Sequence, residues 1–207
     1  MTWKQISLAQ WNKLAEISAA EYEDEILQTA DVISAIFGIE SPMELSPMEF
    51  QKYVKELSFM KDPIPEVKLC NCYTINGTKY NFKGNIFECN MSQLMDVRSF
   101  TTTTPIDYAN VLSVFMIPDG HKYNDGYDMD KTISDISTLP ITDVMKLYSF
   151  FSASLLLSTD IMTDYFNKEL KKTNLSQKEK ETIQDKMKEL REITSMIFYP
   201  IFSVTAK

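Results

Sequence analysis

The chain has 207 residues, of which 44% are hydrophobic and 12% aromatic, and its formal net charge is −8. This apolar content excludes a disordered chain and is sufficient for one large domain or two small ones. The acidic balance argues against a nucleic-acid-binding protein, because such surfaces depend on Lys and Arg side chains that neutralise phosphates. No nucleic-acid partner is therefore expected.

Helix-start signals dominate residues 1–65, which we predict to be a helical N-terminal unit. Ser7-Leu8-Ala9-Gln10 is a capping box, in which the serine hydroxyl and the glutamine side chain satisfy backbone donors. A second helix is predicted over 22–37, ending at Gly38. Ser41-Pro42 and Ser46-Pro47 repeat a start signal with proline in the first turn, and the second of them should begin a helix over 47–59.

The next segment, 66–140, is predicted to hold a hairpin, short helices and a loop. Asn76-Gly77 lies between Cys72-Tyr73-Thr74-Ile75 and the strand-forming run 78–82, the strongest short-range signal of a β-hairpin. Ile86 and Phe87 are candidates for a third short strand. Helices are predicted over 92–99, 107–117 and 129–136, the last capped by Asp128 or Asp130.

Two long helices with hydrophobic repeats are predicted in the segment 141–207. Alternating spacings of four and three keep side chains on one helix face, a pattern typical of helix–helix packing. Their short connection ends in a capping box at Ser176 and predicts an antiparallel pair. The fold class is therefore mainly α with a small β-hairpin (α+β). One predicted seam comprises Val144, Tyr148, Phe151, Leu155, Ser158, Met162 and Tyr165, and the other comprises Ile183, Met187, Leu190, Thr194 and Ile197.

The charge pattern of 168–192 allows two interpretations. Eight basic and six acidic residues lie there. Mixed charges at this density are typical of the solvated side of an amphipathic helix, which we prefer over a site for polyanions because the whole chain is acidic.

Neither a secretory signal nor a membrane-spanning run is evident in the sequence. The longest apolar run, around residues 155–157, falls well short of the roughly 20 residues that cross a bilayer. We therefore expect a cytoplasmic protein with free thiols.

Candidate catalytic and metal-binding residues are few. His121 is the only histidine, and we interpret it as an exposed loop residue rather than a catalytic base. The Asp-rich stretch 124–130 does not fit a calcium loop, since His121 and Tyr123 would fall on ligand positions. Cys70, Cys72 and Cys89 could bind zinc together with His121, but a small buried apolar patch suits the Cys-x-Cys spacing better. We predict no enzyme, no cofactor and no metal.

The C-terminal segment 193–204 is apolar around the whole helix axis. Such a segment either docks into a groove of its own chain or contacts a partner. We hypothesise partner binding through this segment and through the exposed edge of the hairpin. We therefore expect deletion of residues 195–207 to weaken client or self-association while leaving the helices folded. The candidate partner-binding residues are Ile193, Met196, Ile197, Phe198, Tyr199, Ile201, Phe202, Ile75, Tyr80 and Phe82.

A set of short motifs runs from Trp3 to Asp128. Trp3-Lys4-Gln5-Ile6 precedes a helix, and Glu49-Phe50 is followed by Leu57-Ser58-Phe59. The central matches are Ile75-Asn76-Gly77 with Tyr80, then Phe115-Met116-Ile117-Pro118, then Lys122-Tyr123-Asn124-Asp125-Gly126-Tyr127-Asp128. These motifs resemble proteins from the tail-morphogenesis region of tailed bacteriophages of gut bacteria. The resemblance spans about residues 3–166 and includes no catalytic motif.

This resemblance implies a tail assembly chaperone, which keeps tape-measure or tail proteins in solution until assembly. The implied partners are phage tail or other virion proteins, with homo-oligomers possible and no membrane contact. The implied location is the cytoplasm of the infected host cell. The alternative is a structural virion protein of the tail or of the head–tail junction. The resemblance transfers no binding residues.

Overall fold

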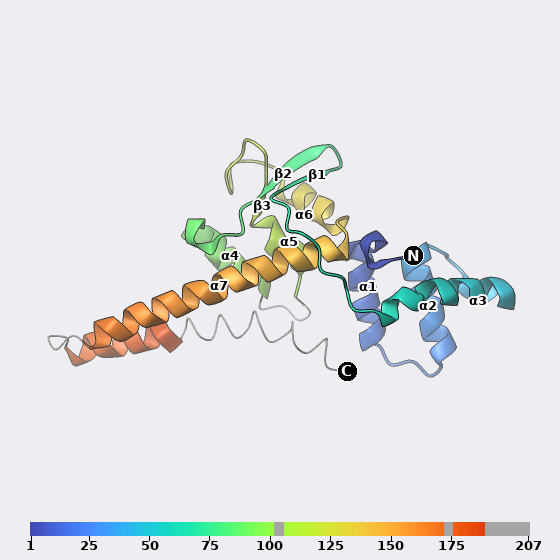
Figure 1. Cartoon of the computed structure of the whole chain (residues 1–207), viewed down its shortest axis with the longest axis horizontal. Coiled ribbons are helices and arrows are strands. Elements are labelled where there is room, and N and C mark those ends of the chain that lie inside the picture. The colour runs from blue at the N-terminus through green and yellow to red at the C-terminus, as the bar shows by residue number, and fades with distance from the viewer. Residues whose placement is uncertain (102–105, 172–175, 189–207) are drawn as a thin grey trace.

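The computed structural model describes residues 1–101, 106–171 and 176–188 and has a mainly α-helical fold with one small sheet (Figure 1). The N-terminal elements are η1 (Trp3–Gln5), α1 (Leu8–Ala19), α2 (Glu25–Phe37), η2 (Pro42–Glu44), α3 (Pro47–Glu56) and η3 (Leu57–Lys61). The central elements are β1 (Cys72–Ile75), β2 (Thr78–Phe82), η4 (Ile86–Glu88), α4 (Met91–Thr101), α5 (Tyr108–Ser113), β3 (Met116–Pro118) and α6 (Met129–Ser137). The chain continues into α7 (Ile141–Leu170) and a further helix over 177–188.

The predicted helix starts are confirmed by their hydrogen bonds. The Ser7 hydroxyl accepts a bond from the Gln10 backbone N–H, and the Gln10 side chain accepts one from the Ser7 N–H. Reciprocal bonds of the same kind begin α3 at Ser46 and the 177–188 helix at Ser176. Asp128 caps α6, and Gly38 ends α2 in the left-handed conformation. The start signal at Ser41 produces only the single turn η2, without a side-chain cap.

The sheet confirms the predicted hairpin but not the predicted third strand. β1 and β2 pair antiparallel around the Asn76-Gly77 turn, where both residues have positive φ. Ile86 lies in the short helix η4, and the third strand is β3, which pairs with β2 and makes it the central strand. The helix predicted over 107–117 accordingly stops at Ser113, because residues 116–118 extend to join the sheet.

One hydrophobic core crosses the boundaries that the sequence suggested at residues 65 and 140. It contains Trp3 and Phe59 from the N-terminal unit, Tyr80 and Phe115 from the centre, and Phe151 from α7. The backbone also ties these parts together: Ile6 accepts a hydrogen bond from the Ile141 N–H, and Leu139 accepts one from the Leu8 N–H. The start of α7 is thereby fixed against the N-terminus.

The molecule is elongated because α7 runs along its long axis and projects beyond the core (Figure 1). The elements α1, α2 and α3 lie at one end, and the sheet with α5 and α6 lies over the middle. The helix 177–188 runs back from the tip of α7 in the opposite direction. At 30 residues, α7 is about 45 Å long, longer than the core that it crosses.

Candidate protein-interaction surface

The two halves of α7 differ in what surrounds them. The first half is buried in the core through Val144, Leu147, Tyr148, Phe151 and Leu155, and it contacts η1, α1, α5 and η4. The last buried position is Thr159, whose hydroxyl donates to the Leu155 carbonyl. After Leu155 only Thr159 of α7 is buried, so the second half of the helix, from Leu156 on, projects beyond the core.

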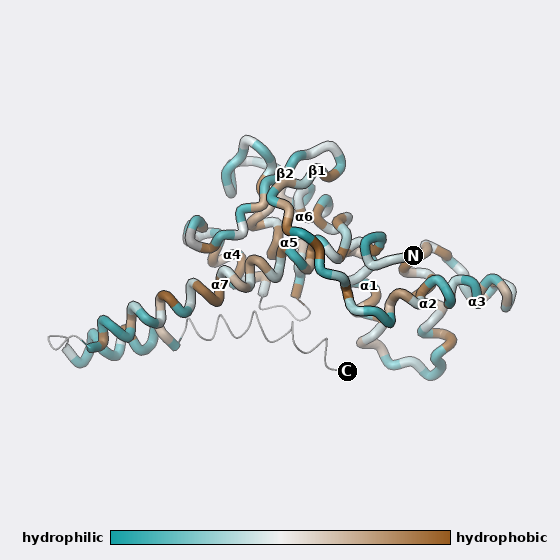
Figure 2. Tube along the Cα trace, in the orientation of Figure 1, coloured by the Kyte–Doolittle hydropathy of each residue, from teal (hydrophilic) through white to brown (hydrophobic). Residues whose placement is uncertain are grey.

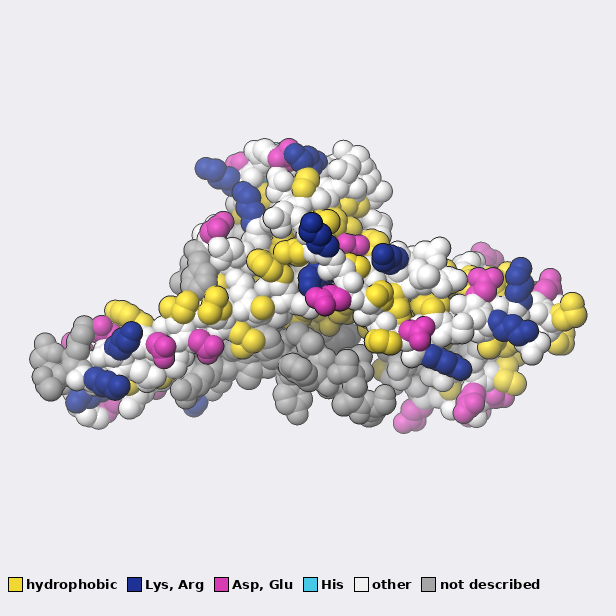
Figure 3. Space-filling view, in the orientation of Figure 1, with side chains coloured by type: hydrophobic (Ala, Val, Ile, Leu, Met, Phe, Trp, Pro, Cys, Tyr) yellow, Lys and Arg dark blue, Asp and Glu magenta, His cyan; other side chains and the backbone are white. Residues whose placement is uncertain are grey.

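The projecting half of α7 nevertheless carries large apolar side chains. Leu157, Ile161 and Tyr165 are 56%, 51% and 58% exposed. Their spacing of four residues places them on the same side of the helix, over about 12 Å of its length. Leu156 and Met162 are also exposed nearby. Figure 2 shows hydrophobic stretches in the middle of α7, and Figure 3 shows hydrophobic side chains at several places along it. We name Leu157, Ile161 and Tyr165 the α7 stripe.

The predicted seam on α7 is confirmed in its first part and wrong in its last. Val144, Tyr148, Phe151 and Leu155 are buried, whereas Met162 and Tyr165 are exposed. Spacing marks a helix face, but the extent of the core decides how much of that face is covered. On the other predicted seam Met187 is buried and Ile183 half-buried, while Leu190, Thr194 and Ile197 lie outside the described residues.

The hairpin residues that we expected to bind a partner are buried instead. Tyr80 is 1% exposed, and Ile75 and Phe82 also belong to the core. β3 covers the edge of β2, and the Phe82 ring packs under the backbone of Gly84 and against the ring of Phe150. The side chains of Ile75, Tyr80 and Phe82 are therefore not exposed for a partner, although β1 is an edge strand of the sheet. The other candidates, Ile193, Met196, Ile197, Phe198, Tyr199, Ile201 and Phe202, lie outside the described residues.

A buried carboxylate in the hairpin region has a structural role. Asp135 of α6 accepts hydrogen bonds from the Tyr80 hydroxyl at 2.6 Å, from Asn76 Nδ2 at 2.8 Å and from Lys131 Nζ at 2.7 Å. Burial favours a higher pKa for Asp135, but these donors outweigh it and hold its pKa below the ordinary value. The network fastens the hairpin to α6, and the carboxylate lies buried in the fold rather than in an open cleft.

The residues considered for metal or acid–base chemistry do not converge. His121 is exposed, as expected, and its ring lies 5.9 Å from that of Tyr127. Cys70 and Cys72 are exposed rather than buried, which corrects the apolar-patch interpretation for these two thiols. Across residues 1–101, 106–171 and 176–188, no group of three or more His, Cys, Asp or Glu side chains is arranged to hold a metal ion.

Comparison with known proteins adds no relatives. No protein-family model matches the chain, and neither a curated protein nor a solved structure shows significant similarity to it. Among the helices that the structure describes, none has the length and hydrophobicity needed to span a bilayer.

Proposed function

We propose that this protein is a non-enzymatic tail-morphogenesis protein that acts as an assembly chaperone, binding a tail or tape-measure protein through the α7 stripe. The observation that carries the proposal is the exposure of Leu157, Ile161 and Tyr165 on a helix that extends beyond its own core. Water-exposed apolar side chains clustered on one face are a typical feature of protein-interaction sites.

The α7 stripe fits a helical partner that binds with moderate affinity. Covering one such half-exposed side chain contributes about 1 kcal/mol, so the stripe supports a moderate, reversible contact. An amphipathic helix can lie along the projecting half of α7 and contact the stripe at successive turns. Reversible binding of this kind suits a chaperone that releases its client on assembly.

The proposed role in phage tail morphogenesis rests on the motif resemblance. The resemblance spans about residues 3–166, and its matching motifs run from Trp3 to Asp128. A structural protein of the tail or head–tail junction would need a similar surface, and this is the alternative. Mass spectrometry of purified particles separates the two: a chaperone is absent from the virion, whereas a structural protein is present in stoichiometric amount.

The contact itself is tested by co-producing the chain with a tail or tape-measure protein of a tailed bacteriophage. We expect the triple substitution Leu157→Ser, Ile161→Ser and Tyr165→Ser to reduce co-purification at least about tenfold. The matched control, Asp160→Asn with Asp164→Asn, changes exposed polar residues of the same helix segment and should bind normally. Undiminished co-purification by the folded triple variant would refute the proposed contact.

A further inference from the structure

The negative charge of the chain is concentrated in one stretch. Residues 14–51 contain nine of the 29 Asp and Glu residues and none of the 21 Lys and Arg residues. This stretch includes α2 and η2 and the second half of α1. None of its carboxylates forms an ion pair with another described residue. An unneutralised surface of this kind attracts cationic partners and repels nucleic acid.

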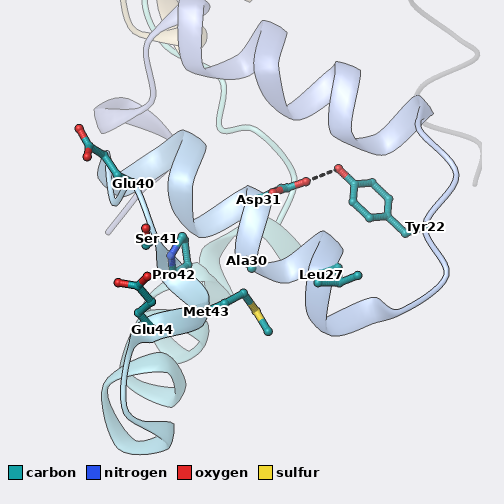
Figure 4. Close-up of a pocket in the computed structure, with 9 residues that line it drawn as sticks. All are labelled: Tyr22, Leu27, Ala30, Asp31, Glu40, Ser41, Pro42, Met43 and Glu44. Carbon is teal, nitrogen blue, oxygen red and sulfur yellow. Dashed lines mark hydrogen bonds between the residues drawn. The ribbon is translucent and has the colours of Figure 1, made fainter.

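An open pocket of about 480 Å³ lies within the same stretch, where η2 packs against α2 (Figure 4). Its base is formed by Ala30 and Pro42, which are both buried. Leu27 and Met43 line it and remain 44% and 57% exposed. Apolar surface is thus available inside a concave site and is not merely scattered over a convex helix.

Acidic groups stand on both sides of this apolar base. Tyr22 and Asp31 lie on one side, joined by a 2.7 Å hydrogen bond from the Tyr22 hydroxyl to Asp31 Oδ2. This bond raises the pKa of the Tyr22 hydroxyl and holds Asp31 at the rim. Glu40 and Glu44 stand on the other side and project outward (Figure 4).

We propose that this pocket docks a basic amphipathic segment of another protein. An apolar side chain of that segment packs between Leu27 and Met43 over Ala30 and Pro42. Flanking Lys or Arg side chains pair with Asp31 on one side and with Glu40 and Glu44 on the other. Charge complementarity selects this occupant, because an acidic or neutral segment would leave the carboxylates unpaired. The site is separate from the α7 stripe and does not depend on the proposed chaperone function.

The test uses a synthetic fluorescein-labelled peptide of leucine and lysine at helical spacing, with binding followed by fluorescence anisotropy. We expect Leu27→Ser with Met43→Ser to weaken peptide binding about tenfold. We expect Asp31→Asn, Glu40→Gln and Glu44→Gln together to weaken it comparably and to reduce its dependence on salt. A peptide with glutamate in place of lysine should not bind.

Two control variants test whether the loss of peptide binding is specific to the pocket. Met48→Ser removes a more exposed apolar side chain outside the pocket, and the triple α7 stripe variant alters the other surface. Both should bind the peptide like the original protein. All substitutions are at exposed positions, and circular dichroism checks that the variants remain folded.

Three outcomes would overturn the proposal. The first is no measurable binding of the basic peptide, and the second is equal binding by the pocket variants and their controls. The third is found by light scattering: if the pocket substitutions dissociate a homo-oligomer, the occupant is a second copy of the chain.

Discussion

The hydroxyl of Tyr80 donates a 2.6 Å hydrogen bond to Oδ2 of Asp135, and both residues are buried. The bond joins the central strand β2 to α6, which are 55 positions apart in sequence. Asn76 in the hairpin turn and Lys131 one helical turn before Asp135 donate to the same carboxylate. The hairpin is thus attached to the helix by a buried charge with three donors.

Tyr80→Phe removes one donor from this buried carboxylate and leaves the ring in place. We expect the free energy of unfolding to fall by about 1–3 kcal/mol, because a buried charge that loses a donor retains its desolvation cost. Urea denaturation at neutral pH measures the change. Tyr165→Phe, on the exposed part of α7, is the matched control and should leave stability within about 0.5 kcal/mol. Equal stabilities of the two variants would contradict this account of Asp135.

The same carboxylate predicts how stability depends on pH. The pKa of Asp135 is lower in the folded protein than its ordinary value of 3.8, so ionised Asp135 stabilises the fold. This contribution is complete above the unfolded pKa and is lost as pH falls through the lower folded pKa. Asp135→Asn should therefore flatten the dependence of unfolding free energy on pH below about 4.

An exposed carboxylate provides the comparison. Asp119 also has a lowered pKa, owing first to its hydrogen bond from Asn81 and then to Lys79, but it is solvent-exposed. Solvent screening makes such a pair contribute little. Asp119→Asn should leave the pH profile nearly unchanged, and a larger effect from Asp119 than from Asp135 would disprove the assignment.

Close packing of Gly84 on Phe82 can be tested by a double-mutant cycle. A methyl group at Gly84 would meet the Phe82 ring, which is buried and cannot swing freely into solvent. Gly84→Ala should destabilise the protein by about 1–3 kcal/mol. In a Phe82→Leu background, Gly84→Ala should reduce the stability by less, because the smaller side chain leaves room for the methyl group. Additive effects in thermal unfolding would argue against this contact, and Lys83→Ala serves as the control.

The three thiols should differ in reactivity. Burial, with a smaller contribution from the Glu88 charge, raises the pKa of the Cys89 thiol to about 11. Because the thiolate is the nucleophile, Cys89 should react slowly with iodoacetamide near pH 8 and faster as the pH approaches 11. Cys70 and Cys72 are exposed and should be modified first. Peptide mass spectrometry gives the order, and a denatured sample, in which all three react alike, is the control. Equal rates in the folded protein would contradict burial of Cys89.

The candidate interaction surface could be predicted only in part. The repeat that includes Met162 and Tyr165 marked an apolar helix face, but it gave no sign that the core ends at Thr159. The opposite error occurred at the hairpin, where Ile75, Tyr80 and Phe82 appeared to be free. Asp135 of α6 binds Tyr80, Phe150 of α7 packs against Phe82, and β3 pairs with β2. Sequence spacing carries no information about which distant segment packs where. The acidic pocket likewise depends on η2 folding back onto α2.

The sequence by itself determined the local features. The caps at Ser7, Ser46, Ser176 and Asp128 and the turn at Asn76-Gly77 follow from hydrogen bonds and φ angles within four residues. Only the tertiary structure decided that residues 116–118 form a strand, that Ile75, Tyr80 and Phe82 of the hairpin are buried and that half of α7 is exposed. These outcomes depend on contacts between segments far apart in the chain, where packing overrides local preference.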